Sequence, residues 1–372
     1  MSFLRASLMS MLTAGVLSAA ENTVVLNIEP AKENPRNSEG SFATLKSGRI
    51  LFYYTQFYGG AADNSPARIV CVHSDDRGRT WCAPHTVIEN ASGENVMSVS
   101  LLRLKSGKLA LFYCVKNSLH DCRACICIST DEGETWSEPK LVVPAPGYFV
   151  LNNDRVIQLN SGRLVVPVAF HRSRHSDPKD WKSFDGRGIA LWYLSDDEGQ
   201  TWTEAATWWA APAHSSAGLQ EPGVVELADG SLFSWARTTL GAQYGFTSAD
   251  RGKTWSAPEP TSLKSPCSPA SIKRLPNSPE LLAVFNDHSG AFEFPKGKRT
   301  PLVSAVSSDG GKTWSRHKLI ESDPDGWYCY TAIHFTDDAV LLAYCAGDKK
   351  VGGLNRLRIR RISLDWLKTG QP

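Results

Sequence analysis

The sequence carries almost no net charge, because 40 lysines and arginines oppose 38 aspartates and glutamates and leave +2 over 372 residues. A balance of this kind provides no general attraction for nucleic acid or for an anionic membrane surface. We therefore expect no nucleic-acid partner. Any binding of an anion has to depend on a few cations gathered at one place.

Long apolar runs are also missing. Residues 8–17 form a short apolar run that cannot span a bilayer, and no later segment is long enough, so no membrane span is predicted. The run follows Arg5 and precedes the small residues Ser-Ala-Ala at 18–20, which is the order of a secretory signal peptide. Residues 1–20 are therefore predicted to be a signal peptide of a secreted or periplasmic protein, with a frayed cytoplasmic N-terminus as the alternative.

The cysteines do not form the pattern of a disulfide framework or of a metal site. Nine is an odd number, so at least one cysteine has no partner within the chain. Cys71, Cys125, Cys127 and Cys345 lie in apolar runs typical of strands, which favours buried thiols. Cys122 is close to Cys125 and Cys127, but no second cluster or nearby histidine completes a zinc set. We expect neither a metal nor a cofactor.

One short motif is present five times. The copies are SDDRGRTW from Ser74, STDEGETW from Ser129, SDDEGQTW from Ser195, SADRGKTW from Ser248 and SSDGGKTW from Ser307. In SxDxGxTW the Asp can accept hydrogen bonds from its own turn, Gly tolerates positive φ, and Trp can pack between sheets. Five copies cannot all face one substrate, so the motif is predicted to be a structural turn. Its aspartates are then not catalytic: Asp76, Asp131, Asp197, Asp250 and Asp309.

A second pattern, an apolar residue followed by a tight turn and an apolar run, predicts six hairpins. The copies are LKSGRILFYY from Leu45, LKSGKLALFY from Leu104, LNSGRLVVPV from Leu159, LADGSLFSWA from Leu227, LPNSPELLAVF from Leu275 and FTDDAVLLAY from Phe335. With the apolar runs and boxes that follow, the unit has about four strands and recurs at roughly 50 to 70 residues. The sequence predicts an all-β fold over residues 21–372: one six-bladed β-propeller of four-stranded antiparallel blades with five Asp-box turns. A strand near residues 23–28 is expected to complete the sixth blade, which lacks a box.

The innermost strand of a propeller blade begins near the axis, so a pocket is expected from residues just before the hairpins. These stretches contain Arg36, Asn153, Asp154, Arg155, Glu221, Tyr328 and Tyr330. Burying an Arg, a Glu and a Tyr near an axis is costly unless they are paired or used. We therefore expect the chemistry here, although a purely structural ion pair between Arg237 and Glu221 is an alternative for those two residues.

A chain with five boxes, six hairpins and these polar residues before the hairpins resembles the exo-sialidase (neuraminidase) family. The resemblance covers nearly the whole chain after residues 1–20. The resemblance implies that terminal sialic acid is released from a glycan by a Tyr nucleophile assisted by a Glu, with an Asp acid/base. It also implies that three arginines bind the substrate carboxylate. Such an enzyme is a retaining exo-α-sialidase, acts on sialylated glycans and is expected to be a monomer.

The motifs of the family place the three arginines on this sequence. Arg36 lies in NPRNSEGSFATLKSGRILFYY, where Asn-Ser follows it in place of the usual Ile-Pro. Arg237 ends the fourth hairpin, and Arg299 lies in KRTPLVSAVSSDGGKTW before the last boxed strand. A planar guanidinium suits this role because it binds both carboxylate oxygens at once. Asp154 and Arg155 are further candidates for contacts with the arms of the sugar.

The resemblance also assigns the catalytic residues. Asp63 in ADNSPARIVCVHSDDRGRTW corresponds to the acid/base, and Glu221 in LQEPGVVELADGSLFSWAR corresponds to the Glu. Tyr330 in GWYCYTAIHFTDDAVLLAY corresponds to the nucleophile, with Tyr328 as the alternative. A neutral phenol suits a sugar with a carboxylate on its anomeric carbon. A carboxylate nucleophile would meet a repulsion of about 4 kcal/mol at a separation of about 4 Å.

Other functions are compatible with parts of this pattern. Asp-box repeats alone would favour a non-catalytic propeller that binds glycans or proteins. A related nonulosonic acid as substrate, or transfer of the sugar between glycans, would use the same residues. Only the joint presence of three arginines, a Glu and a Tyr on one rim favours the hydrolase.

Overall fold

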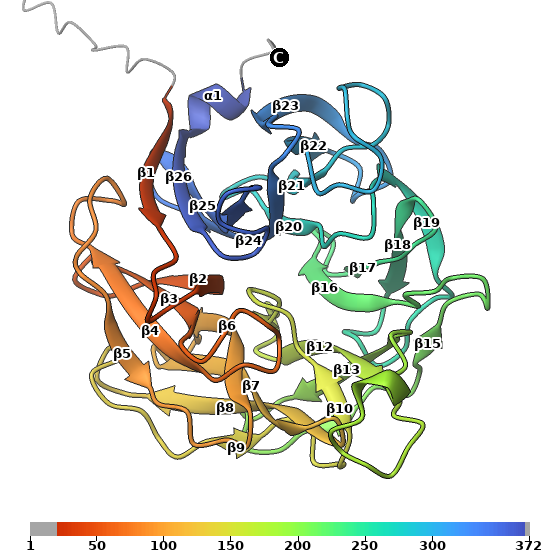
Figure 1. Cartoon of the computed structure of the whole chain (residues 1–372). Helices are drawn as coiled ribbons and strands as arrows, with labels where there is room; N and C mark the ends of the chain where they lie inside the picture. The colour runs from red at the N-terminus through yellow and green to blue at the C-terminus, as the bar shows by residue number, and fades with distance from the viewer. Residues whose placement is uncertain (1–20, 369–372) are drawn as a thin grey trace, which may run out of the picture.

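The structure is a computed structural model that describes residues 21–368, and strands dominate it (Figure 1). Four of its sheets have four antiparallel strands each, and a fifth sheet has ten strands. The sheets are arranged around a common centre, with β2, β6, β16, β20 and β24 nearest to it (Figure 1). The predicted all-β class and its four-stranded antiparallel sheets are confirmed. The predicted signal peptide, residues 1–20, lies outside the described residues.

Each four-stranded sheet extends from an inner strand to an outer one. The first contains β2 (Arg36–Thr44), β3 (Ile50–Phe57), β4 (Ala67–Ser74) and β5 (His85–Ile88). The second contains β16 (Gln220–Glu226), β17 (Leu232–Arg237), β18 (Ala242–Ser248) and β19 (Glu259–Lys264). The third contains β20 (Ser271–Arg274), β21 (Leu281–Asn286), β22 (Leu302–Ser307) and β23 (Ser315–Glu321). The fourth contains β24 (Trp327–Phe335), β25 (Ala339–Gly347), β26 (Leu357–Ser363) and β1 (Asn22–Ile28).

The ten-stranded sheet consists of two groups of strands. One group is β6 (Asn95–Arg103), β7 (Leu109–Ser118), β8 (Asp121–Ser129) and β9 (Lys140–Leu141). The other is β10 (Tyr148–Val150), β11 (Ile157–Gln158), β12 (Leu164–His171), β13 (Ile189–Ser195), β14 (Thr203–Glu204) and β15 (Trp209–Ala210). Strand β10 joins the groups, because it pairs parallel with β8 and antiparallel with β12. A 3-10 helix η1 (Trp181–Ser183) lies between β12 and β13, and a short helix α1 (Leu364–Lys368) follows β26.

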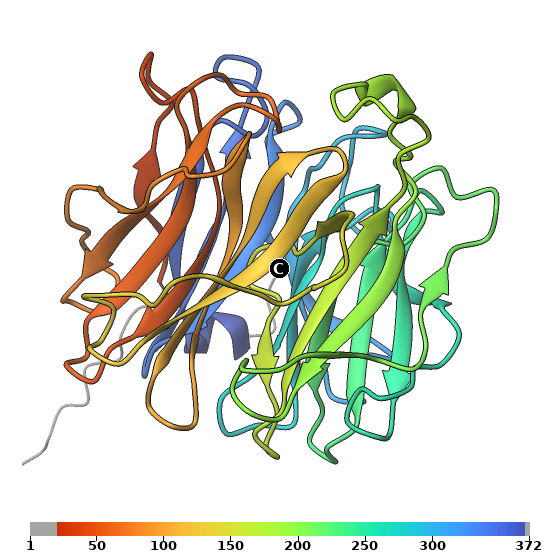
Figure 2. The ribbon, with the colours of Figure 1, turned by 90° about the horizontal axis from the view of Figure 1, so that it is seen from below.

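All six predicted hairpins are present as antiparallel pairs. They are β2 with β3, β6 with β7, β11 with β12, β16 with β17, β20 with β21, and β24 with β25. The strand predicted near residues 23–28 is β1, which pairs with β26. Strands from the two ends of the described chain therefore share one sheet. Seen from the side, the long strands run between two ends of the molecule, and many of the connecting loops gather at those ends (Figure 2).

Apolar side chains fill the spaces between neighbouring sheets. Phe52 and Val70 of the first sheet belong to one buried cluster with Leu341 and Ile359 of the last. This packing joins the first and last sheets and so fixes the arrangement around the centre. All nine cysteines have free thiols, and seven of them are buried, as the sequence predicted for strand residues.

The five boxes form turns closed by their own side chains. In the first box, Asp76 accepts hydrogen bonds from the N–H of Thr80 at 2.9 Å, from its hydroxyl at 2.7 Å and from the Ser74 hydroxyl at 2.7 Å. The Gly of a box can lie against a neighbouring sheet: a methyl group on Gly78, which follows the first sheet's β4, would come within 2.7 Å of Leu341 on β25 of the last sheet. The boxes therefore close turns and allow neighbouring sheets to approach, as predicted.

We expect Asp76→Ala to lower the free energy of unfolding by about 2 kcal/mol, because several hydrogen bonds of one turn are lost together. Chemical denaturation measures this change, and turnover per folded molecule is expected to stay within about twofold of wild type. The matched control is Asp75→Ala, whose ion pair with Arg49 is exposed to solvent, so its free energy of unfolding is expected to stay close to that of wild type. Equal losses in both variants, or a loss of turnover in Asp76→Ala, would contradict a structural role for the box.

Four inner strands share a distortion near their first residues. In β2, β6, β16 and β24 the pairing register shifts, and one residue at each shift has positive φ. These residues are Glu39 (φ 51°), Ser98 (φ 64°), Glu221 (φ 51°) and Tyr330 (φ 59°). A non-glycine residue in this region costs on the order of 1 kcal/mol or more, and bulges of this kind redirect side chains next to functional sites. Two of the four residues are the predicted Glu and nucleophile.

Candidate functional site

A cavity of about 190 Å³ lies where these distorted strands begin. Its walls include all four residues with positive φ, and they also include side chains from the loops that follow β3 and β12. Its lining includes acidic, basic and phenolic side chains: Glu39, Asp63, Lys116, Glu221, Arg237 and Tyr330. Three of these were predicted to be catalytic and one to bind the substrate carboxylate. The structure therefore brings together residues that are more than 200 positions apart in the sequence.

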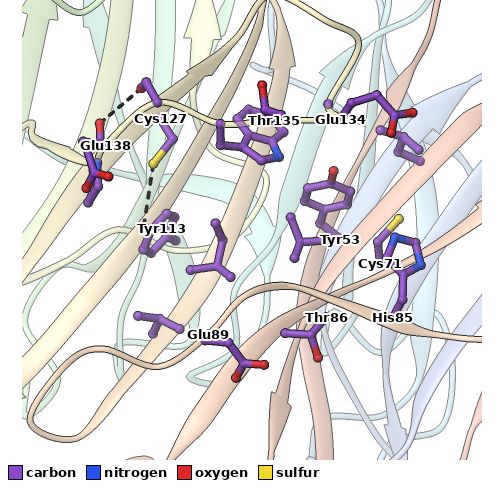
Figure 3. A pocket seen from close by; sticks show the side chains of 18 of the residues that line it. Tyr53, Cys71, His85, Thr86, Glu89, Tyr113, Cys127, Glu134, Thr135 and Glu138 are labelled. Carbon is purple, nitrogen blue, oxygen red and sulfur yellow. Dashed lines mark hydrogen bonds between the residues drawn. The ribbon is translucent and has the colours of Figure 1, made fainter.

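A larger cavity of about 830 Å³ lies between the first sheet and the ten-stranded sheet and shares no lining residue with this site (Figure 3). Its labelled residues include Tyr53, His85, Glu89 and Tyr113, which come from β3, β5, β7 and the segment after β5. None of the residues predicted for catalysis or carboxylate binding lines it. We therefore take the smaller cavity as the candidate active site.

The phenol of Tyr330 is hydrogen-bonded to a carboxylate. Its hydroxyl donates to Glu221 Oε1 at 3.2 Å, and the other oxygen of Glu221 pairs with Arg237 Nη1 at 3.0 Å. Burial and the charge of Glu221 raise the pKa of Tyr330, although Arg237 and Arg299 act in the opposite direction. A neutral phenol next to a carboxylate that accepts its proton is the arrangement that an activated Tyr nucleophile requires.

Tyr328, the alternative nucleophile, lies on the same strand but does not line the cavity. Its ring packs edge-on against Tyr344 at 6.3 Å within an apolar cluster. The bulge between Cys329 and Ala332 separates the surroundings of the two tyrosines. The structure therefore brings Tyr330, and not Tyr328, to Glu221.

Two of the three predicted arginines, Arg237 and Arg299, lie beside the tyrosine, whereas Arg36 contacts Glu39 and Asp63. Of the three, only Arg237 lines the cavity itself. Arg237 Nη1 lies 3.4 Å from the Tyr330 hydroxyl, and the Arg299 guanidinium lies 5.4 Å from the centres of both the Tyr330 and Trp327 rings. Among the described residues, Arg299 Nε and Nη1 are buried without a hydrogen-bond partner, and so is Arg36 Nε. Buried donors without partners are costly, and an anionic ligand would satisfy them.

Arg36 and Asp63 form an ion pair at the mouth of the cavity. Arg36 is 1% exposed, and its Nη1 donates to Asp63 Oδ1 at 2.5 Å. The Asp63 side chain is 66% exposed. Partial burial of the carboxyl group raises the pKa of Asp63, but the adjacent Arg36 guanidinium lowers it by more. The net effect is a lowered pKa. In this arrangement the predicted acid/base is ionised at neutral pH.

Two predicted substrate contacts, Asp154 and Arg155, do not line the cavity. Asp154 accepts hydrogen bonds from the Ser41 hydroxyl at 2.8 Å, from Lys273 Nζ at 2.9 Å and from the Ile333 N–H at 2.9 Å. It therefore ties β2, β20 and β24 together near the centre, and its oxygens are already used. The Arg155 guanidinium lies 5.4 Å from the centre of the Trp235 ring, and burial lowers its pKa to about 10. Contact of these two residues with the arms of the sugar stays a prediction.

Glu39 is a carboxylic acid in the cavity that the prediction missed. It is 3% exposed, accepts a hydrogen bond from the Ser98 hydroxyl at 3.2 Å and lies 3.5 Å from Arg36 Nη2. The sequence contains a signal for Glu39. It stands six positions before Leu45, which opens the first hairpin, just as Glu221 stands six positions before Leu227, which opens the fourth.

Lys116 is a second missed residue, and it has no comparable sequence signal. It is 1% exposed at the end of β7 and lies 5.4 Å from the centre of the Tyr148 ring and 5.0 Å from that of Trp181. Its ammonium group donates to the backbone oxygen of Asp63 at 2.8 Å, as does Asn95 Nδ2 at the same distance. Lys116 and Asn95 therefore hold the Asp63 loop at the mouth.

Within residues 21–368 no group of three or more His, Cys, Asp or Glu side chains is arranged to hold a metal ion. The same part of the chain contains no helix that is long and apolar enough to span a membrane.

The sequence and the fold both match known proteins. The model of the BNR repeat-like domain matches residues 52–342. A sialidase of Bacteroides fragilis (strain YCH46) is 27% identical over 222 residues, which are 56% of this chain and 36% of that protein. The chain thus spans little more than a third of this curated relative.

Solved structures of similar fold include the NanB sialidase from Streptococcus pneumoniae, with a TM-score of 0.71 and 17% identity. That match covers 93% of this chain and 71% of the other. The intramolecular trans-sialidase from Ruminococcus gnavus matches with a TM-score of 0.69 and 18% identity, covering 94% of this chain and 98% of the other. At these identities the structural matches concern the fold.

Proposed function

Because this chain belongs to the BNR repeat-like family, we propose that it is a glycosidase that releases a terminal sialic acid from a glycan by a retaining mechanism. The observation that carries the proposal is the contact of the Tyr330 hydroxyl with Glu221 at 3.2 Å, beside the guanidinium groups of Arg237 and Arg299. A phenol paired with a proton acceptor is the arrangement that a Tyr nucleophile needs, and it favours the glycosidase over the non-catalytic binding propeller.

The proposed architecture is a six-bladed propeller. The four sheets of four strands count as one blade each. The ten-stranded sheet counts as two blades, with β6 to β9 in one and β10 to β15 in the other, joined where β10 pairs with β8. Six inner strands then meet around the centre, and the cavity lies at the end where they begin.

In the proposed first step the Tyr330 oxygen attacks the anomeric carbon and its proton passes to Glu221. The bond from the anomeric carbon to the leaving oxygen breaks, and that oxygen takes a proton from Asp63. In the second step Asp63 removes a proton from water and the water oxygen attacks the same carbon. The bond from that carbon to the Tyr330 oxygen breaks, and Glu221 returns the proton to Tyr330. Two displacements retain the configuration at the anomeric carbon.

The substrate carboxylate is proposed to bind Arg36, Arg237 and Arg299. This binding also explains how Asp63 acquires a proton. Once a substrate carboxylate shares Arg36, the ion pair that lowers the pKa of Asp63 is weakened, and closure over the sugar removes solvent. Both changes raise the pKa toward the range that a general acid needs.

Asp63→Asn tests this assignment through the leaving group. We expect hydrolysis of a natural sialoside to fall by about 10³-fold, because its leaving alcohol needs protonation. An aryl sialoside with an acidic phenol needs little protonation, so its first step is expected to fall by about tenfold or less. Single-turnover kinetics with both substrates measure the difference. Equal losses on the two substrates would remove Asp63 as the acid.

The proposal as a whole is tested by release of a fluorescent phenol from an aryl α-sialoside by the purified wild-type protein. We expect measurable turnover, with the α-anomer of sialic acid formed first in a proton NMR time course. If the β-anomer forms first, the double displacement is wrong. Absence of turnover of every aryl nonulosonic acid glycoside would favour the alternative, a non-catalytic propeller that binds glycans or proteins.

A further inference from the structure

Glu39 is the acidic group in the cavity to which neither the family resemblance nor the proposed mechanism gives a role. It stands on β2 at the same kind of bulge that places Glu221 on β16, with φ of 51° in both cases. Its side chain lines the cavity together with Glu221 and Tyr330. A strained backbone and a buried acid at one position are costly, and such positions cluster at functional sites.

The contacts of Glu39 couple it to the first predicted carboxylate-binding arginine. Its Oε1 lies 3.5 Å from Arg36 Nη2, and its Oε2 accepts the Ser98 hydroxyl at 3.2 Å. Arg36 already has a closer anionic partner in Asp63, at 2.5 Å. The guanidinium charge is therefore balanced by Asp63, and an ionised Glu39 would be a surplus negative charge in a buried place.

Charged and titratable groups surround Glu39 from several elements. Those that face it are Arg36 on β2, Asp63 in the following loop, Glu221 on β16, Tyr330 on β24 and Cys345 on β25. Burial raises the pKa of Glu39 to about 7; Arg36 opposes this rise, and Asp63 and Glu221 add to it. Glu39 thus changes its charge near neutral pH.

We propose that Glu39 binds substrate only in its protonated form, so that the substrate carboxylate and one proton enter the site together. The inference depends on the proposed function for the identity of that carboxylate. An ionised Glu39 would compete with the substrate for Arg36 and repel its carboxylate. A protonated Glu39 leaves Arg36 to the substrate and supplies an O–H donor. The proton comes from solvent, and no covalent bond to carbon changes.

Isothermal titration calorimetry tests the coupling directly. The probe is 2-deoxy-2,3-didehydro-sialic acid, titrated at pH 8 in two buffers of different ionisation enthalpy. We expect the wild type to take up close to one proton on binding, and its affinity to fall by nearly tenfold per pH unit above pH 8. Glu39→Gln keeps the size and an N–H donor but cannot ionise. Its proton uptake is expected to be near zero and its affinity flat within about twofold.

Two further variants separate Glu39 from other sources of a proton. At pH 8 a carboxyl whose pKa rises only to the range of a general acid stays ionised, so Asp63→Asn is expected to keep the uptake. Loss of the uptake in Asp63→Asn would assign the proton to Asp63 and overturn the inference. Glu259→Gln, an exposed change on the outer strand β19, is expected to match the wild type.

The two proposals fail in different ways. Binding of the probe by wild type without proton uptake would overturn the role of Glu39 and leave the proposed function intact. No binding by the folded wild type would remove the proposed function and this inference with it. If Glu39→Gln does not fold, the uptake by wild type and by Asp63→Asn still decides the question.

Discussion

Replacing Tyr330 with phenylalanine is expected to lower kcat on an aryl α-sialoside by roughly 10⁴-fold or more, with KM changed by less than about tenfold. The variant keeps the ring and its packing beside Arg299, and it loses only the oxygen that we propose attacks the anomeric carbon. The arginines proposed to bind the carboxylate are unchanged, so we expect binding of the substrate to be retained. The measurement is steady-state kinetics. The concentration of active sites is determined by titration with a tightly binding inhibitor.

Tyr328→Phe is the matched control for this variant. The same atom is removed from the same strand two residues away, where the side chain packs in an apolar cluster and does not line the cavity. Its kcat is expected to stay within about twofold of wild type. A large loss in Tyr328→Phe with little loss in Tyr330→Phe would move the nucleophile to Tyr328.

Glu221→Gln is expected to lower kcat by about 10³-fold, which is within the range of general-base removal. The amide cannot accept the phenolic proton from Tyr330, and Arg237 loses the carboxylate that balances its buried charge at 3.0 Å. The unpaired guanidinium is also expected to stabilise bound carboxylates, so the affinity for a sialic acid analogue is expected to stay the same or rise.

Pre-steady-state kinetics distinguish a base from a structural ion pair. If Glu221 assists the attack of Tyr330, the first chemical step slows and no burst of phenol is seen. If Glu221 only neutralises Arg237, melting temperature falls while the rate of the first step per folded molecule is preserved. Glu259→Gln, with the same chemical change on the exposed face of β19, serves as the control and is expected to change neither quantity.

The sequence predicts the fold well because its repeats specify the strands and turns. Six hairpins and five boxes each specify local structure, and their order leaves few ways to arrange the strands. The pairing of β10 with β8 was not predicted, because three residues of β10 make one parallel contact that no local pattern encodes. This contact merges two groups of strands into one sheet of ten.

The site was predictable where a motif fixed the position relative to a hairpin. Glu221 and Tyr330 meet as expected, since both lie just before the hairpin of an inner strand. Asp154 satisfies the same rule but binds Lys273 and Ile333 instead of lining the cavity. A position near the axis does not by itself put a side chain into the cavity. Asp154 has a positive φ of 57°, and a backbone of this kind redirects the side chain.

Glu39 and Lys116 show two different limits of the prediction. Glu39 was available from the repeat, because it occupies in the first hairpin the place of Glu221 in the fourth. Lys116 was not, since its role depends on the Tyr148 and Trp181 rings and on the Asp63 loop, which come from three distant segments. A lysine at the end of a strand is ordinarily solvated, and nothing local marks this one as buried.

Trapping the covalent intermediate would identify the nucleophile. Wild-type protein incubated with a 2,3-difluorosialic acid, whose C3 fluorine slows the second step, is digested and analysed by mass spectrometry. We expect one glycosyl adduct, on the oxygen of Tyr330. An adduct on Glu39, Glu221 or Asp63, or time-dependent inactivation with no adduct on Tyr330, would contradict this expectation.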